Sequence, residues 1–538
     1  MNSPSEHTER LHALDATRAF ALILGVIFHA VWFYAPYTMN QAVFDVRSNH
    51  FFGWFFFASH SFRMQLFFVI AGFFGRLLIE RRGVRGFVSN RWKRIGIPLL
   101  VGWLFLFPLF YIVWIWGYRA SGQMDFPAPL YVVPLWLFLG GAAFEHRANG
   151  GAFNLTHLWF LYQLLVFYSL ALGIRSFARM ESGDESPLWS RIDRCVRWVT
   201  RGFLGLLAFS ILCAPGMYFM RAWNGVDTPA MSLIPDAFPT LVYFLFFALG
   251  WALHRQMREL ATRFRQWRWF LALALIGSVP LYWVFLEVDT HETALAQGTL
   301  EGREVVDWEA FGASLNAGLA QSDDSRDTLG RLTLNLSPLN RESLAGEDPL
   351  SRSERSGLLM AINRALTQAA LTAEEYSAPE LGAPVETSRE AVLLNRKALD
   401  ELWLGVEPTG FRRSRNYLVT KAWYSLAYSV MMVAFVFGTL GAFQELCHSH
   451  SPTWRYFADA SYWIYIAHIP VVPILEILIF RWDIPSWIKV PGLLVVSFSI
   501  LTLSYHYLVR STFIGKALNG RKYPYAPNVW KVIRHGAD

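Results

Sequence analysis

Long apolar stretches divide the whole sequence, and they constrain the fold more than any other feature. A helix needs roughly 20 mostly apolar residues to cross the hydrocarbon core of a bilayer. Stretches of about this length occur at ten places: residues 14–35, 52–79, 95–117, 155–175, 201–220, 238–255, 268–286, 417–442, 461–480 and 488–510. With 54% hydrophobic and only 17% charged residues, an ordinary soluble globular protein is excluded. The sequence therefore predicts an all-α polytopic membrane protein with about ten transmembrane helices.

Basic residues are concentrated in alternate loops between these stretches. The loop at 76–94 contains seven Lys and Arg residues against one Glu, and those at 175–201 and 255–268 are also rich in Arg. Loops of the other parity, such as 36–51 and 221–237, contain few. Because excess Lys and Arg stay on the cytoplasmic side, both termini are predicted to be cytoplasmic. This topology and contact with anionic membrane lipids explain the net charge of +7, and no nucleic-acid partner is predicted.

Residues 287–414 are acidic and lack the apolar character of the flanking stretches. Parts of this segment have the spacing of short amphipathic helices, but no catalytic motif is visible in it. We expect an extracytoplasmic insertion between helices seven and eight, with a packing or substrate-docking role. It separates the two parts of a membrane domain, residues 1–286 and 415–512, and a cytoplasmic tail follows at 513–538. The three cysteines have neither paired nor metal-type spacing, so neither a disulfide framework nor a metal site is predicted.

The first apolar stretch contains three ionisable residues: Asp15, Arg18 and His29. Asp or Arg at the centre of a membrane helix costs roughly 2.5–3.5 kcal/mol on insertion scales. Eleven residues separate Arg18 from His29, which is about 16 Å of helix and leaves the two about 20° apart around its axis. Asp15 lies one turn before Arg18 on much the same face. This alignment indicates either a buried ion pair with a hydrogen-bonded histidine, or a functional pathway across the helix, which intramembrane ionisable groups commonly mark.

The second stretch adds His60 and Arg63, which are three residues apart and so share a helix face. The predicted topology places His60 in the outer half of its helix, at a depth similar to that of His29. An imidazole is a suitable general base because its unperturbed pKa is near 6.5. Two interpretations of Arg63 stay open: a structural ion pair with Asp15, or the binding of an anion.

Other polar residues lie at the ends of later stretches. Arg91 and Arg94 are one turn apart at the cytoplasmic mouth of the third. They indicate either ordinary anchoring by basic residues or the recognition of phosphate by paired guanidinium groups. His157 begins the fourth stretch, and His468 shares a face of the ninth with Tyr465. For each of these histidines taken alone, a hydrogen-bonded interior residue is the simpler interpretation.

Several of these motifs carry a family resemblance. Arg18 and His29 form an R-x10-H pattern, and Arg91 and Arg94 form an R-x-x-R pattern within "RWKRIGIP". Both resemble elements of the membrane-bound acyltransferase-3 family. In addition, "LDATRA", "HSFRMQLFFVIAGFF", "RIGIP", "HLWFL" and "ASYWIYIAHIP" are similar, in order, to the branch of that family that succinylates osmoregulated periplasmic glucans.

The resemblance implies a bacterial inner-membrane O-acyltransferase that uses an acyl-CoA, such as succinyl-CoA, as co-substrate and a periplasmic glucan as acceptor. Arg91 and Arg94 would bind the phosphates of the donor, with no permanently bound cofactor. Asp15, Arg18 and His29 would be the catalytic residues. His29 would act either as a general base on a sugar hydroxyl or as a transient acyl carrier.

The same resemblance places four further residues at the substrate: His60, Arg63, His157 and His468. Two alternatives stay open at this point. One is acyl transfer to another cell-envelope glycan, since the insertion at 287–414 has no counterpart in the family pattern. The other is a transporter that uses Asp15, Arg18 and His29 as a relay. Transporters commonly contain internal repeats. The R-x10-H pattern does not recur after residue 240, which is not what such a repeat would give.

Overall fold

The computed structural model describes residues 4–36, 43, 45–121, 154–182, 187–230, 232–296, 415–447, 449, 451–520 and 522–535. Over this part of the chain the regular structure is helical, which confirms the all-α prediction. The elements are α1 (Pro4–Trp32), α2 (His50–Arg91), η1 (Trp92–Gly96), α3 (Ile97–Ala120), η4 (Thr156–Leu158), α5 (Trp159–Ser182), α6 (Pro187–Val199), α7 (Phe203–Tyr218), α8 (Ala237–Leu253), η5 (His254–Thr262), α9 (Trp267–Ala296), α15 (Arg415–Leu446), α16 (Pro452–Ile479), α17 (Ser486–Ser504), η7 (Tyr505–Val509), α18 (Phe513–Asn519) and α19 (Val529–His535). The predicted insertion lies outside the described residues, apart from the end of α9.

Each of the ten predicted stretches falls on a helix or a helical run of this list. Eight helices of the described chain are long and apolar enough to cross a membrane, and a ninth is counted if the bent pair Trp189–Val199 and Phe203–Tyr218, which meet at 111°, is one span. The shortfall from ten arises because His50–Gly117 is a single helical run of 68 residues. At 1.5 Å per residue such a run is about 100 Å long, several times the hydrocarbon thickness.

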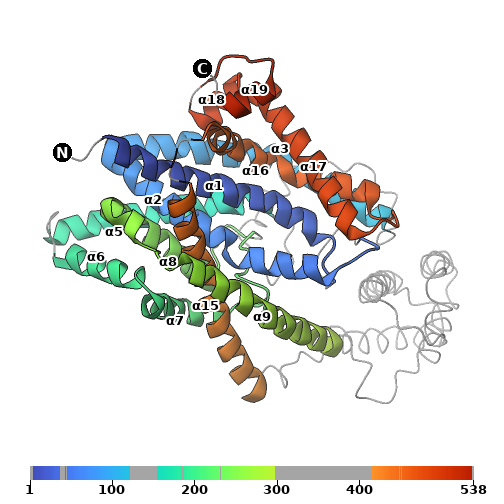
Figure 1. The fold of residues 1–538 in the computed structure, drawn as a ribbon, viewed down its shortest axis with the longest axis horizontal. Coiled ribbons are helices and arrows are strands. Elements are labelled where there is room, and N and C mark those ends of the chain that lie inside the picture. Colours follow the sequence, from blue (N-terminus) through green and yellow to red (C-terminus); the bar gives the residue numbers. More distant parts are fainter. Residues whose placement is uncertain are drawn as a thin grey trace, which may run out of the picture.

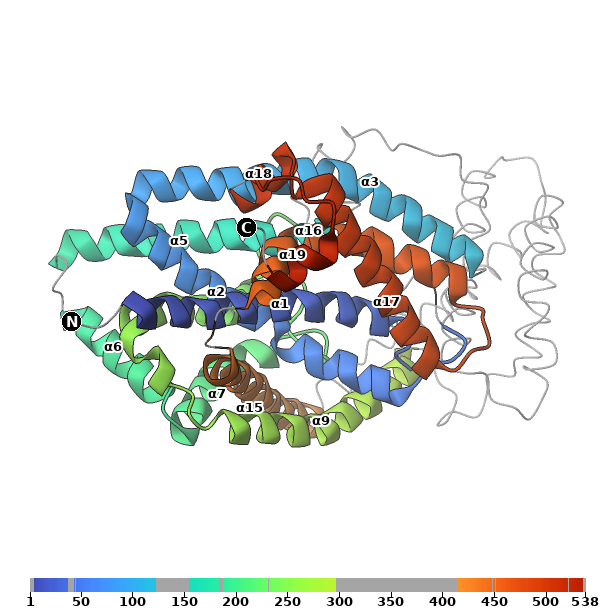
Figure 2. The same ribbon diagram turned by 45° about the horizontal axis from the view of Figure 1, so that its top comes forward.

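That run is broken at Gly83, whose φ of 64° and ψ of 177° are not helical. Glycine adopts this conformation at little cost because it has no side chain beyond Cα. Figure 2 shows α3 running back across the molecule after α2. The break therefore separates two of the predicted stretches, 52–79 and 95–117, within one helical run.

Helix α1 lies at the centre of the bundle, in contact with α2, α15 and α16 (Figures 1 and 2). On the side of α2 away from α1, helix α8 approaches very closely. A Cβ atom built at Gly72 would lie 2.0 Å from the carbonyl oxygen of Phe247, and one at Gly250 would lie 1.8 Å from that of Val69. The two helices thus touch through their backbones, as membrane helices do where small residues face each other.

Substitution of Gly250 by alanine is expected to lower the free energy of unfolding by about 3 kcal/mol, because the added methyl group must push α8 away from α2. Gly277→Ala is the matched control, since a Cβ there meets nothing within 4 Å. Thermal unfolding of the purified protein in detergent measures both. Equal melting temperatures for the two variants would contradict the close helix contact.

A buried ionic network joins the loop after α1 to the C-terminal end of α16 and to the beginning of α17. Lys489 donates to Asp45 and to the carbonyl oxygens of Phe480 and Trp482, the latter at 3.0 Å. The hydroxyl of Tyr34 donates to Glu476 at 3.1 Å. Asp45, Lys489 and Glu476 are each at most 5% exposed. Burial raises the pKa of the Asp45 carboxyl, and the adjacent ammonium group compensates part of that cost.

Lys489→Met is expected to destabilise the fold by about 3–5 kcal/mol, because removing one partner of a buried ion pair leaves the other without a counter-charge. The control is Arg47→Gln, which breaks the ion pair with Asp483 at 2.5 Å, where both side chains are more than half exposed. An exposed pair contributes at most about 1 kcal/mol. A melting temperature unchanged in Lys489→Met would show that the network is not structural.

The segment after the last long helix folds back onto the bundle. Helices α18 and α19 contact α16 and lie at its end in Figure 1. The connecting chain is held by hydrogen bonds: Nε2 of His506 to the carbonyl oxygen of Ala526 at 2.7 Å, and Nη1 of Arg510 to that of Pro524 at 3.0 Å. Residues 513–520 and 522–535 therefore pack on the helical body, which the sequence-based assignment of 513–538 to a cytoplasmic tail did not include.

Candidate functional site

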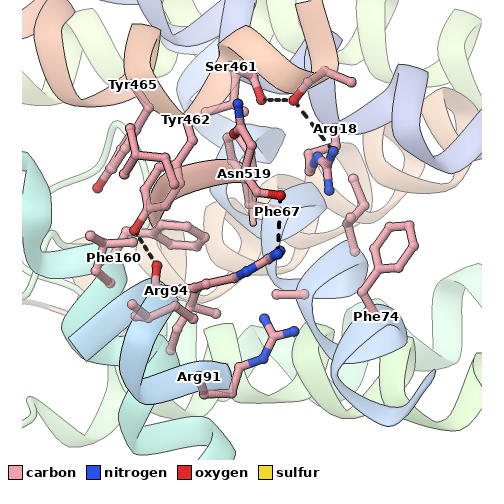
Figure 3. A pocket seen from close by; sticks show the side chains of 18 of the residues that line it. Arg18, Phe67, Phe74, Arg91, Arg94, Phe160, Ser461, Tyr462, Tyr465 and Asn519 are labelled. Carbon is pink, nitrogen blue, oxygen red and sulfur yellow. Dashed lines mark hydrogen bonds between the residues drawn. The ribbon is translucent and has the colours of Figure 1, made fainter. Parts of the chain in front are cut away.

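A cavity of about 240 Å³ opens between α1, α2, η1, α5, α16 and the C-terminal end of α18, at the end of the bundle that α18 covers. We call it the arginine cavity, because Arg18, Arg91 and Arg94 all line it. Figure 3 shows their guanidinium groups pointing into the same space. The rest of the lining is aromatic and aliphatic, with Phe67, Phe160 and Tyr465 among it. A cationic, partly apolar cavity of this kind suits an organic anion.

The arginines of this cavity are incompletely neutralised. Arg18 pairs with Asp15 at 3.2 Å. Arg94 donates to the backbone carbonyl oxygen of Asn519 at 3.1 Å. Arg91 lies over the ring of Tyr168, with its guanidinium carbon 5.2 Å from the ring centroid. The one carboxylate in the lining, Asp459, accepts from Tyr523 at 2.5 Å and lies 3.4 Å from Arg455. The cavity thus keeps a net positive charge that an anionic ligand can neutralise.

A second group of basic residues lies further along the same helices. We call it the histidine cluster: His29, His60, Arg63, His157 and His468. The ring centroids of His29 and His468 are 5.0 Å apart, and those of His157 and His468 are 5.6 Å apart. His60 and Arg63 join through Phe28, whose ring centroid is 5.4 Å from that of His60 and 4.0 Å from the guanidinium carbon of Arg63.

Helical periodicity places the two groups one above the other. On α2, Arg63 lies one turn from the cavity residue Phe67. On α16, His468 lies one turn from Tyr465. His157, in the short helix before α5, lies three residues from the cavity residue Phe160 of α5. On α1 the step is longer, from Leu22 to His29.

The tautomer of His468 follows from its hydrogen bonds. Its Nδ1 lies 2.7 Å from the carbonyl oxygen of Tyr465 and 3.2 Å from that of Ile464. Carbonyl oxygens only accept, so Nδ1 carries the proton and Nε2 keeps a lone pair. That Nε2 is buried without a hydrogen-bond partner, as are Nε2 of His157 and Nδ1 of His29. Buried polar atoms are usually satisfied, so this concentration of unsatisfied ring nitrogens is typical of a binding site rather than of a structural core.

Loops hold two of the histidines in place. His60 Nδ1 lies 3.0 Å from the carbonyl oxygen of Asn224, and the next residue, Gly225, leaves room for the ring, since a Cβ there would lie 2.3 Å from Nδ1. His157 follows Thr156, which adopts a left-handed φ of 53°. Such a conformation costs about 1–3 kcal/mol and is often found at functional sites.

The structure separates the predicted site residues into two groups. It brings Arg18, Arg91 and Arg94 to one cavity, with Asp15 at its edge, and it gathers the four histidines and Arg63 in the cluster. The alternative in which Arg63 pairs with Asp15 is wrong, because Asp15 pairs with Arg18. Among the residues that the structure describes, no three His, Cys, Asp or Glu side chains are arranged to hold a metal ion.

Sequence reasoning missed several residues of the arginine cavity. Tyr462 lines it and donates to the backbone carbonyl oxygen of Arg94 at 2.7 Å. Asn519, in α18, lines it as well. In the sequence, Ser461, Tyr465 and His468 are spaced to share one helix face. Tyr462 is next to Ser461 and could have been added to this set. No sequence signal places Asn519 there, because only the folding back of the chain end does so.

The fold defines a polytopic membrane protein, and its interior holds a cationic cavity and a buried histidine cluster. An acyltransferase-3 family model, described as an acyltransferase domain, matches residues 11–300. The chain belongs to this family of membrane acyltransferases. The matched residues include Arg18, Arg91 and Arg94 of the arginine cavity and all of the histidine cluster except His468.

Curated relatives are similar over a smaller part of the chain. Glucans biosynthesis protein C of Escherichia coli (strain SMS-3-5 / SECEC) is 31% identical over 185 residues, which is 33% of this chain and 42% of that protein. The protein of the same name from Shigella dysenteriae serotype 1 is 30% identical over 185 residues, with the same shares. The chain thus matches less than half the length of these relatives. No solved structure matches the chain.

Proposed function

We propose that this membrane acyltransferase moves a succinyl group from succinyl-CoA to hydroxyl groups of a periplasmic glucan. One observation carries the proposal: a cationic cavity suited to a phosphorylated donor lies next to a cluster of unsatisfied imidazoles, and α1, α2 and α16 carry residues of both. The names of the relatives support a glucan as the acceptor. The free carboxylate of a succinyl group also suits a site that contains a buried arginine.

In this proposal the donor enters the arginine cavity from the cytoplasm. Arg91 and Arg94 bind its phosphates, because guanidinium groups form paired, charge-assisted hydrogen bonds with phosphate oxygens. Arg18, held by Asp15, neutralises charge deeper in the cavity. The acyl arm then follows α1 toward His29, a distance of eleven residues or about 16 Å, and the glucan approaches the histidine cluster from the periplasm.

The chemical step is a transesterification. A sugar hydroxyl oxygen attacks the thioester carbonyl carbon while His29 takes the hydroxyl proton. The tetrahedral intermediate collapses, the C–S bond breaks, and the CoA thiolate leaves and receives that proton, so an ester and CoA thiol are formed. General-base catalysis of this kind contributes about 10²–10⁴-fold. His468, whose lone pair faces the cluster, and His157 bind the acceptor sugar.

The proposed setting is the bacterial inner membrane, with both termini cytoplasmic and residues 287–414 in the periplasm. There the acidic segment would be on the side from which the glucan approaches. Its place between α9 and α15, the helices that flank it, is compatible with a role in docking the acceptor.

The proposal is tested by mass spectrometry of periplasmic glycans from cells with and without this protein. We expect a mass increase corresponding to succinyl substitution only in cells that make it. The purified protein in lipid nanodiscs should transfer the acyl group of succinyl-CoA to extracted glucan. Substitution of a different envelope glycan, or glycan flux into vesicles without acyl transfer, would contradict the proposal and favour the respective alternative.

A further inference from the structure

Arg63 is a buried cation for which the described part of the chain provides no counter-charge. Its side chain is in the interior of the bundle, with 8% of the residue exposed, and its Nε has no hydrogen-bond partner. No ion pair joins it to any described carboxylate. Asp227, an acidic residue of the loop that contacts His60 through Asn224, accepts hydrogen bonds from the backbone of Arg221 and Ala222 at 3.0 and 3.1 Å.

An unpaired buried guanidinium is costly. The penalty for taking a charge out of water is several kcal/mol, and it is recovered only if an anion with suitable hydrogen bonds is close. The ring of Phe28, 4.0 Å from the guanidinium carbon, returns only part of this, on the order of 2 kcal/mol, by a cation–π interaction. The surroundings are otherwise basic, with His29, His60 and His468 nearby. Such a residue is suited to receive an anion that arrives with a substrate.

The position of Arg63 along α1 is fixed by a close contact. A Cβ atom at Gly25 would lie 3.3 Å from Nη1 of Arg63, so the guanidinium packs against α1 at the level of Gly25. His29 is one helical turn further along, which is a rise of about 6 Å. Arg63 also lies one turn from Phe67 of the arginine cavity. The guanidinium is therefore between the end of the cavity and His29.

This spacing suits a short dicarboxylic acyl group. The two carboxyl carbons of a succinyl group are separated by three C–C bonds, or about 4 Å in the extended form. The donor arm passes Arg63, and the free carboxylate turns back toward the cavity to form a hydrogen bond with its guanidinium group. The reacting carbonyl carbon would then lie at the level of the next turn, where His29 lies. A shorter chain would stop before His29, and a longer one would have to fold.

Resting on the proposed acyl transfer, we infer that Arg63 is the specificity residue of the acyl group. It binds the free carboxylate of a four-carbon dicarboxylic acyl chain and thereby sets the carbonyl carbon opposite His29. The enzyme accordingly selects its donor by charge and by chain length, and neutral acyl chains are rejected because they leave the guanidinium buried and unpaired.

The test compares succinyl-CoA with butyryl-CoA, which has the same four-carbon chain without the carboxylate. For the wild-type protein in nanodiscs with extracted glucan, we expect a kcat/KM about 100-fold higher for succinyl-CoA. Malonyl-CoA and glutaryl-CoA should both be poorer donors than succinyl-CoA. In Arg63→Met the preference for succinyl over butyryl should disappear, and in Arg63→Lys it should be intermediate.

Arg76→Met is the matched control. Arg76 is another buried arginine of α2, but it has its own carboxylate, Glu80, at 2.8 Å. Its substitution can lower stability, yet the ratio of succinyl to butyryl transfer should stay at the wild-type value. Equal use of both donors by the wild type, or an equal loss of both in Arg63→Met, would overturn the inference.

Binding gives a readout that does not depend on transfer. Thermal stabilisation of the wild-type protein should require about 100-fold less succinyl-CoA than butyryl-CoA, and Arg63→Met should remove this difference. If the wild type transfers neither acyl group, the proposed function is wrong, and the binding ratio still decides the role of Arg63. Equal stabilisation by the two donors would show that Arg63 does not bind the free carboxylate of the acyl group.

Discussion

His29→Ala is expected to lower kcat for acyl transfer about 10³-fold, with a much smaller change in the KM for the donor. The reason is that the proposed base contacts only the reacting hydroxyl, while the donor phosphates bind in the arginine cavity some 16 Å away. A small residual rate is expected from His468, whose ring centroid is 5.0 Å from that of His29. The measurement is acyl transfer to extracted glucan by the purified variant.

His50→Ala provides the control for His29. His50 begins α2 and contacts Trp283, with ring centroids 5.3 Å apart, and it is exposed and outside the histidine cluster. We expect its substitution to leave the rate near that of the wild type. Full activity of His29→Ala, at the same amount of folded protein, would show that another group takes the proton. Loss of activity with an equal loss in His50→Ala would indicate a general effect on the fold.

Arg91→Gln is expected to raise the KM for acyl-CoA about 10- to 100-fold, because a hydrogen bond to a charged group contributes about 1.5–3 kcal/mol. Arg91 is the better test of phosphate binding than Arg94, since Arg94 also holds the chain end through the carbonyl oxygen of Asn519 at 3.1 Å. Initial rates over a range of donor concentrations give both constants. The effect should weaken as salt screens the interaction.

Arg85→Gln is the matched control for Arg91. Arg85 belongs to the same basic segment but is exposed and does not line the arginine cavity. Its substitution should leave the KM for the donor unchanged. If Arg91→Gln and Arg85→Gln behave alike, the arginines of this segment serve only as basic anchors on one side of the membrane, and the phosphate-binding role is wrong.

The elements of the bundle were predictable because each depends on local composition. A run of some 20 apolar residues can satisfy its backbone in a bilayer only as a helix, and so 14–35 and 417–442 correspond to α1 and α15. The sequence predicted a loop at 76–94, between the stretches that form α2 and α3, but it did not predict the conformation of that loop. The chain departs from helical geometry at Gly83, and a π-helical turn at Trp92–Gly96 then leads into α3.

The arginines and histidines of the candidate site were predicted from the sequence, but their arrangement and the lining residues Tyr462 and Asn519 were not. Helical geometry aligns Asp15 with Arg18 on one helix, and their ion pair at 3.2 Å follows from a spacing of three residues. The neighbours of Arg63 could not be inferred in this way. Its contact with α1 at Gly25 depends on how two helices pack, which no spacing within either helix determines.

The sequence alone determined that this chain is a helical membrane protein with basic and imidazole groups at defined positions along its helices, because hydrophobic runs and helical periodicity are properties of one segment at a time. The tertiary structure decided which of those groups meet. Packing of α1, α2, α5 and α16 separates the arginines from the histidines and leaves Arg63 between them, and the chain end closes over the arginine cavity. Such contacts join residues hundreds of positions apart, and only the folded bundle brings them together.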